Sequence, residues 1–181
     1  MSTVYFFCDV DGVLNALGPA PVGDHRPVVQ VESLRREVFP IRYDPRVVSA
    51  LNDLTRSGLM ELIWLSTWSA SARERLAPAI GQEGGSRVLA DANDPSLARS
   101  PYDAHRPWWK LQLLLDAIAD DPDRAVVWVD DDLDDGTKAR FPELHPGPSL
   151  LITPDPGVGL TPDGVDEITA FVRRHAAGQA T

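Results

Sequence analysis

Cysteine is almost absent from this sequence, in which Cys8 is the single one among 181 residues. A lone cysteine cannot form an internal disulfide, so the sequence excludes a small fold held together by disulfides. Long apolar runs are also missing, since none approaches the ~20 residues that span a bilayer as a helix. No basic segment precedes the apolar run that begins at Val4. We therefore predict a cytoplasmic protein without a signal peptide and without a membrane partner.

Positive charge is scarce as well. The chain has 17 lysines and arginines against 27 aspartates and glutamates, which gives a formal net charge of -10. An acidic surface of this kind lacks the electrostatic footprint of proteins that bind nucleic acid or anionic membranes. A local basic patch is compatible with this balance, so nucleic acid is a disfavoured partner rather than an excluded one. Nothing in the sequence indicates an oligomeric state.

The residues that are present predict a single α/β domain over residues 1–181. Hydrophobic residues make up 43% of the chain and charged residues 24%, which is typical of a globular protein. Short apolar runs alternate with segments of helical periodicity, and this alternation predicts a Rossmann-like three-layer sandwich with a mostly parallel central sheet. Residues 16–43 are rich in proline and glycine and are predicted to form a flap or small cap. Residues 176–181 are predicted to form a flexible tail.

Apolar runs and capping residues predict the individual elements. Asp44 and Pro45 suit the N-cap and first position of a helix, and Gly58 suits a helix end. Strands are predicted at residues 4–8, 59–65, 124–129 and 149–152, with weaker ones at 28–31 and 87–90. Helices are predicted at residues 45–57, 69–80, 107–119, 138–144 and 163–175. Residues 91–106 are irregular and polar and have no predicted element.

Two aspartates follow the first predicted strand directly. Asp9 and Asp11 are one residue apart, so in an extended segment their side chains point to the same side. Gly12 then permits a sharp turn without a steric cost. Two such acids repel each other unless a cation lies between them, and a divalent metal such as Mg²⁺ prefers carboxylate and carbonyl oxygen. A solvated acidic turn is the alternative interpretation of this pattern taken alone.

Two further strands also end in polar side chains. The strand at 59–65 is followed by Ser66 and Thr67, and the strand at 124–129 by Asp130 and Asp131. The carboxyl ends of parallel strands share one edge of a sheet, where ligands of open α/β sheets bind. Lys110, at the start of a predicted helix, can reach this edge, although a lysine taken alone is more often solvated. Carboxylates, a metal, a hydroxyl and a lysine together suit the handling of a phosphoryl group.

These segments carry a resemblance to a known family. Residues 9–14, residues 63–67, Lys110 and residues 127–131 match, in order, the four motifs of the haloacid dehalogenase (HAD) superfamily of phosphohydrolases, which this chain resembles. The resemblance covers about residues 3 to 155 as scaffold and is specific at the motifs. No large cap domain is evident, so the chain is similar to small-cap or capless members.

The resemblance implies a role for each motif residue. Asp9 would be the nucleophile that forms an aspartyl-phosphate. Asp11 would protonate the leaving group and then activate the water that hydrolyses the intermediate. Ser66 would hold the phosphoryl oxygens, with Thr67 as the alternative because the strand register is uncertain by one residue. Lys110 would stabilise the nucleophile and the phosphoryl group.

The resemblance also implies Mg²⁺ as cofactor. The ion would be bound by Asp9, by the backbone carbonyl of Asp11 and by Asp131 or Asp130. Asp131 is preferred because family members with paired acids tend to use the second position. The other acids of this segment, Asp132, Asp134 and Asp135, are predicted to form a solvated acidic loop. Trp68 lies just past a strand end, where its indole can pack at the rim or stack on a substrate ring.

The predicted function is therefore that of a magnesium-dependent phosphohydrolase that cleaves a phosphomonoester, with a small phosphorylated substrate. In this family the cap supplies much of the substrate specificity, and a small cap implies an open site. An open site suits a nucleotidase or a nucleic-acid end phosphatase, which is the alternative within the same chemistry. A non-catalytic binding module that has kept the scaffold is the alternative of a different class.

Overall fold

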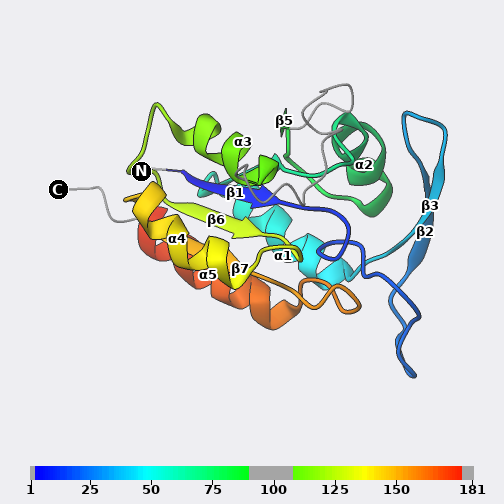
Figure 1. Ribbon diagram of the computed structural model, residues 1–181. Coiled ribbons are helices and arrows are strands. Elements are labelled where there is room, and N and C mark those ends of the chain that lie inside the picture. The colour runs from blue at the N-terminus through cyan, green and yellow to red at the C-terminus, as the bar shows by residue number, and fades with distance from the viewer. Residues whose placement is uncertain (1–2, 90–107, 177–181) are drawn as a thin grey trace.

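The computed structural model describes residues 3–89 and 108–176. Its centre is a five-stranded sheet with the order β5-β4-β1-β6-β7, in which all pairs of neighbours are parallel. The predicted Rossmann-like sheet is therefore confirmed (Figure 1). The strands are β1 Val4–Cys8, β4 Met60–Trp64, β5 Arg87–Val88, β6 Val126–Val129 and β7 Ser149–Ile152.

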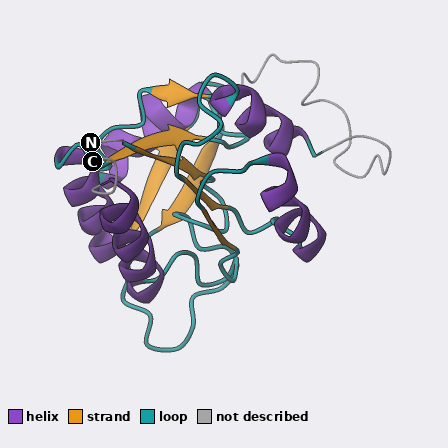
Figure 2. Ribbon diagram, turned by 90° about the vertical axis from the view of Figure 1, so that its left-hand side faces the viewer, coloured by secondary structure: helices purple, strands orange, loops and turns teal. Residues whose placement is uncertain are grey.

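Helices lie on both sides of this sheet, as Figure 2 shows. They are α1 Pro45–Arg56, the π-helix η1 Ala72–Leu76, α2 Ala77–Ile80, α3 Trp109–Ile118, α4 Asp135–Leu144 and α5 Pro162–Ala176. Among the described residues, no helix has both the length and the apolar composition that crossing a membrane would need.

Two hydrophobic clusters fill the space between the three layers. Alternate residues of a strand point to opposite faces of the sheet, so Phe6 and Phe7 of β1 belong to different clusters. Phe6 packs in the cluster that includes residues of α1 and α5. Phe7 packs with Trp128 of β6 in the cluster that includes residues of α3 and α4. The same alternation continues past the ends of β1 and β6, so it determines to which face of the sheet the residues just after these strands point.

The segment predicted as a flap contains a hairpin beside the carboxyl-terminal edge of the sheet (Figure 1). Its antiparallel strands are β2 Val28–Glu32 and β3 Val38–Arg42. The second strand was not predicted, because Pro40 lacks the N–H that a central strand needs. In a two-stranded ribbon each strand has an open edge, where proline is tolerated. We refer to residues 28–42 as the flap hairpin.

The helix predicted at residues 69–80 is present from residue 70 onward, but a π-helix interrupts it, so it is not a regular α-helix. The chain first makes a tight turn, in which Ser69 has a φ of 46°, and then forms the π-turns of η1 before the short helix α2. Pro78 has no N–H and its ring crowds the carbonyl four residues earlier, which a wider turn relieves. Gly81 ends α2 with a φ of 75°, as expected of a glycine at a helix end.

The acidic segment after β6 is also more ordered than predicted. Helix α4 begins three residues before the predicted start at Lys138, because Asp134 is its N-cap and accepts a hydrogen bond from the Thr137 N–H at 2.7 Å. Ala176, the first residue of the predicted tail, is buried in the last turn of α5. The irregular segment 91–106 and residues 177–181 lie outside the described residues.

Candidate active site

Asp9 and Asp130 are brought together by the register of the sheet. Cys8 pairs with Val129 across β1 and β6, so the residue that follows each lies at the same height. The Asp9 N–H donates to the Val129 carbonyl at 3.1 Å. Both aspartates continue the alternation of Phe7 and Trp128, so they point to the face that α3 covers. Their side chains are buried, with Asp130 fully inaccessible.

Lys110 lies between these two carboxylates. It is the second residue of α3 and is only 3% exposed. Its ammonium donates a hydrogen bond to Asp9 Oδ2 and another to Asp130 Oδ2, the latter at 2.7 Å. Burial lowers the pKa of Lys110, but the negative charges of Asp9 and Asp130 outweigh that effect and raise it. The interpretation of Lys110 as a solvated helix lysine is therefore wrong.

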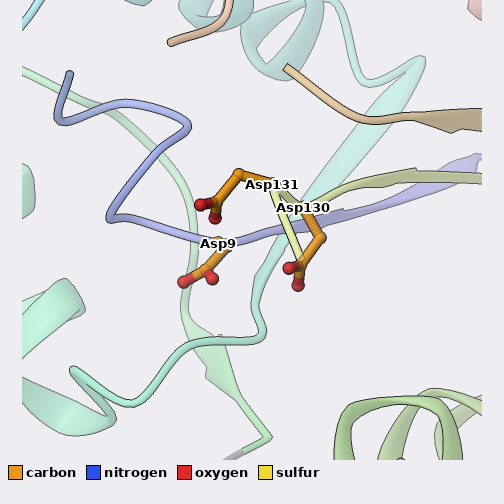
Figure 3. A group of neighbouring side chains, drawn as sticks. All are labelled: Asp9, Asp130 and Asp131. Atoms are coloured by element: carbon orange, nitrogen blue, oxygen red, sulfur yellow. The ribbon is translucent and has the colours of Figure 1, made fainter. Parts of the chain in front are cut away.

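Asp131 completes a group of three carboxylates with Asp9 and Asp130. One carboxylate oxygen from each lies within 4.8 Å of the others. Figure 3 shows the three side chains side by side. Asp131 reaches this position because Gly12 has no side chain. A Cβ on Gly12 would lie 2.2 Å from Asp131 Cγ, and the φ of Gly12 is +69°. Gly12 is thus needed for the approach of Asp131 as well as for the turn.

The charges of this group do not balance. Three carboxylates face one ammonium, and burial and the charge of Asp9 raise the pKa of Asp130 to about 7 despite Lys110. Burial, then the charges of Asp132 and Asp9, raise the pKa of Asp131 to about 6. A divalent cation would offset this excess of negative charge, and an all-oxygen donor set fits Mg²⁺. The residues present therefore fit the predicted cofactor.

The carboxylate of Asp11 lies apart from this group among the described residues. Its Oδ1 accepts from the Asn15 amide and its Oδ2 accepts from the Trp68 indole N–H, each at 2.8 Å. Its position agrees with a role in which only its backbone carbonyl contacts a metal. Neither the contact of Asn15 with Asp11 nor the donor role of the Trp68 indole was predicted from the sequence. Asn15 lies four positions after Asp11, so the tight turn that brings them together is the signal that was missed.

Ser66 and Thr67 lie in different surroundings beyond β4. Ser66 is 1% exposed, and its hydroxyl accepts a hydrogen bond from the Trp68 N–H at 3.3 Å. Thr67 is exposed and lines a cavity of about 560 Å³ together with Asp11, Trp68 and Phe39 of the flap hairpin. The cavity also includes further residues of the hairpin and of the turn before η1.

Comparison with known proteins gives a match to a protein family. The profile of a family described as the HAD domain in Swiss Army Knife RNA repair proteins matches residues 5–165. No protein of curated function matches the chain significantly in sequence.

Among solved structures, a chain from Vibrio cholerae that is provisionally named a 3-deoxy-D-manno-octulosonate 8-phosphate phosphatase is similar, with a TM-score of 0.46 and 14% sequence identity. The match covers 99% of this chain and 88% of that chain. At this level of similarity the activity of the neighbour has no bearing on this chain.

Proposed function

This chain belongs to the family of HAD domains found in Swiss Army Knife RNA repair proteins, and we propose that it is a magnesium-dependent phosphomonoesterase that acts through an aspartyl-phosphate. The observation that carries the proposal is the buried contact of Lys110 with Asp9 and Asp130, with Asp131 beside them. Such a group has little structural value by itself, because burying two acids and half-burying a third with one lysine is costly. A binding module without catalysis has no evident use for it.

The proposed reaction has two steps at the phosphorus atom. In the first, a carboxylate oxygen of Asp9 attacks phosphorus and the bond from phosphorus to the leaving oxygen breaks. The leaving oxygen keeps the electron pair of that bond and receives a proton from Asp11. In the second, water attacks the phosphorus of the aspartyl-phosphate and gives a proton to Asp11, which frees Asp9 and releases inorganic phosphate. General acid and base catalysis of this kind contributes about 10²–10⁴ in rate.

Asp9 and Lys110 have complementary tasks in this scheme. Lys110 donates a hydrogen bond to the Asp9 carboxylate and orients it, and its charge also attracts the phosphoryl oxygens. Asp9, Asp131 and the backbone carbonyl of Asp11 would hold Mg²⁺, with Asp130 as the alternative ligand. When bound, the ion neutralises phosphoryl oxygens and so stabilises the charge of the transition state. The Asp130 contact with Lys110 favours Asp131 as the ligand.

Ser66 and Thr67 remain the two candidates for the hydroxyl that binds the phosphoryl oxygens. The Leu65 N–H donates a hydrogen bond to the Cys8 carbonyl, and Ser66 directly follows Leu65. The backbone of Ser66 therefore lies beside the loop that begins at Asp9. Its hydroxyl is an acceptor in the turn to Trp68, and its own proton remains available for a phosphoryl oxygen. This arrangement favours Ser66, with Thr67 directed to the cavity that lies next to Asp11.

A phosphorylated RNA end is the substrate that the description of the family favours. The position of the site at the edge of the sheet is compatible with this candidate, because a terminal phosphate can enter while the rest of the polynucleotide stays outside. The net charge of -10 counts against tight binding of a long polyanion. A small phosphorylated metabolite or a mononucleotide is the second candidate for the same chemistry.

The test is release of inorganic phosphate from 3′- and 5′-phosphorylated oligoribonucleotides, the matching mononucleotides and a panel of small phosphomonoesters. We expect activity with Mg²⁺, none in excess chelator and none in Asp9→Asn. Asp53→Asn, which changes an exposed aspartate of α1, is the matched control and keeps wild-type activity. Preference for the oligonucleotides over the mononucleotides would identify an end phosphatase. Full turnover in chelator, or in Asp9→Asn, would overturn the mechanism.

A further inference from the structure

Asp11 is held from two sides by residues that the proposed chemistry does not use. The Trp68 indole N–H donates to Asp11 Oδ2, and the Asn15 amide donates to Oδ1, each at 2.8 Å. A charged carboxylate satisfies both donors, and it is the form that Asp11 has after it gives up its proton. Trp68 is 8% exposed, so little solvent competes for this bond.

Both partners of Asp11 are in turn fixed by strand β3 of the flap hairpin. The Phe39 ring packs against the Trp68 ring with centroids 5.1 Å apart. The Asn15 side-chain oxygen accepts from the Arg42 N–H at 3.0 Å. At the other end of the hairpin, the Leu34 N–H donates to the Ser71 hydroxyl at 3.1 Å. The orientation of Asp11 therefore depends on where the flap hairpin lies.

We propose that Trp68 is a positioning residue for the acid–base group Asp11, and that Phe39 on the flap hairpin keeps the Trp68 indole in place for this task. The inference rests on the proposed function, because it assigns Trp68 to the proton transfer of that reaction. Asp11, Thr67, Trp68 and Phe39 line the same cavity, so the leaving group that receives the proton from Asp11 enters beside the two rings.

Leaving groups of different basicity test this assignment. The proton from Asp11 matters for an alkoxide leaving group and hardly at all for 4-nitrophenolate, which departs without protonation. We compare kcat/KM for 4-nitrophenyl phosphate, phenyl phosphate and benzyl phosphate, which have similar size. This parameter reports the steps up to departure of the leaving group and excludes hydrolysis of the aspartyl-phosphate.

Trp68→Phe keeps an aromatic ring against Phe39 and removes the N–H. We expect it to lower kcat/KM for benzyl phosphate about tenfold or more, part of the about 10²–10⁴ that general acid catalysis supplies, and for 4-nitrophenyl phosphate less than about threefold. The matched control is Trp64→Phe in β4, whose buried indole N–H has no hydrogen-bond partner among the described residues. It keeps the wild-type dependence on the leaving group, whatever its effect on stability.

A second variant covers the case in which Trp68→Phe does not fold. Phe39 is 38% exposed, so Phe39→Leu is tolerated, and it gives a smaller loss with the same dependence on the leaving group. If RNA ends are cleaved and the aryl esters are not, the comparison uses an RNA-end phosphate and its analogue with bridging sulfur, which also leaves without a proton.

Equal losses for all leaving groups in Trp68→Phe, or in Phe39→Leu when the first variant does not fold, would overturn the positioning role. So would the absence of any loss in a folded Trp68→Phe. A wild-type protein that is inactive on every ester and RNA end overturns the proposed function, and the inference with it. Activity that depends on Asp9 with no leaving-group effect in the variants overturns the inference alone.

Discussion

The two aspartates of the first loop, Asp9 and Asp11, stand in surroundings of different origin. Asp9 belongs to a cluster fixed by the sheet, in which strand register places Asp9 beside Asp130. Lys110 of α3 donates a hydrogen bond to this pair. Asp11 lies two residues further on but is fixed by side chains from a turn and by the flap hairpin. Charge separates the two as well, since Asp9 faces a lysine and two acids, whereas Asp11 faces neutral donors.

This difference indicates which part of the site depends on the register of the central sheet and which part depends on a separate two-stranded hairpin. A register between central strands cannot shift without moving every side chain of the strand to the other face. The flap hairpin has only two strands, and a two-stranded ribbon is marginally stable by itself. Changes in the Asp9 cluster should therefore abolish chemistry and metal binding together. Changes on the Asp11 side should adjust proton transfer and leave the metal site intact.

Removal of the lysine charge has the largest expected effect. Lys110→Met leaves Asp9 and Asp130 buried without a cation, so we expect activity to be lost. We also expect the metal-free protein to lose about 3–5 kcal/mol of stability at neutral pH, which is typical when one partner of a buried ion pair is removed. Lys138→Met on α4 is the matched control. Chemical denaturation of the two variants with and without Mg²⁺ measures their stability, and release of phosphate measures their activity. An unchanged stability of Lys110→Met would contradict the account.

Gly12 tests the approach of Asp131 to the cluster. In Gly12→Ala the new Cβ would collide with the Asp131 carboxyl group, so we expect Mg²⁺ affinity to fall by about 10–100-fold, as when a metal ligand is poorly oriented. Gly58→Ala is the control, because Gly58 also has a positive φ and nothing lies within 4 Å of its Cβ. Both variants bear a backbone cost of about 1–2 kcal/mol. Calorimetric titration separates them, and equal Mg²⁺ affinities would contradict this role of Asp131.

The pH dependence of stability has a smaller expected effect, with a defined sign. The pKa of Asp130 is raised to about 7 in the folded protein from about 3.8 in the unfolded chain, so the folded state binds the proton more tightly. The stabilisation that this proton gives is complete below about pH 4 and is lost as the pH rises through 7.

Thermal melts of metal-free wild type and Asp130→Asn over pH 4 to 8 measure this contribution. The melting temperature of the wild type should fall relative to that of Asp130→Asn as the pH rises. Mg²⁺ should raise the melting temperature of the wild type more at pH 8 than at pH 5. A difference in melting temperature between the two proteins that does not change with pH would contradict a raised pKa of Asp130.

The contrast between the two regions also explains what could be predicted from the sequence. Asp9, Asp130 and Asp131 follow apolar runs directly, so strand pattern alone places them at one edge, and Lys110 follows from a helix start. Trp68 and Asn15 act through contacts that depend on the turn after β4 and on strand β3. Strand β3 is hard to predict from the sequence, because Pro40 within it lacks an N–H. The π-turns of η1 were missed for a related reason, because residues 69–80 have helical composition and the irregularity arises at Pro78.

The central claim, that Asp9 is the nucleophile and Asp11 the acid and base, has one direct measurement. In Asp11→Asn, 4-nitrophenyl phosphate needs no acid to leave, while hydrolysis of the aspartyl-phosphate lacks its base. Rapid mixing with Mg²⁺ should therefore give a burst of one equivalent of 4-nitrophenol. Mass spectrometry of the acid-quenched protein should locate the phosphoryl group on Asp9. Wild-type turnover without a burst in Asp11→Asn, or with phosphate on any other residue, would contradict the account.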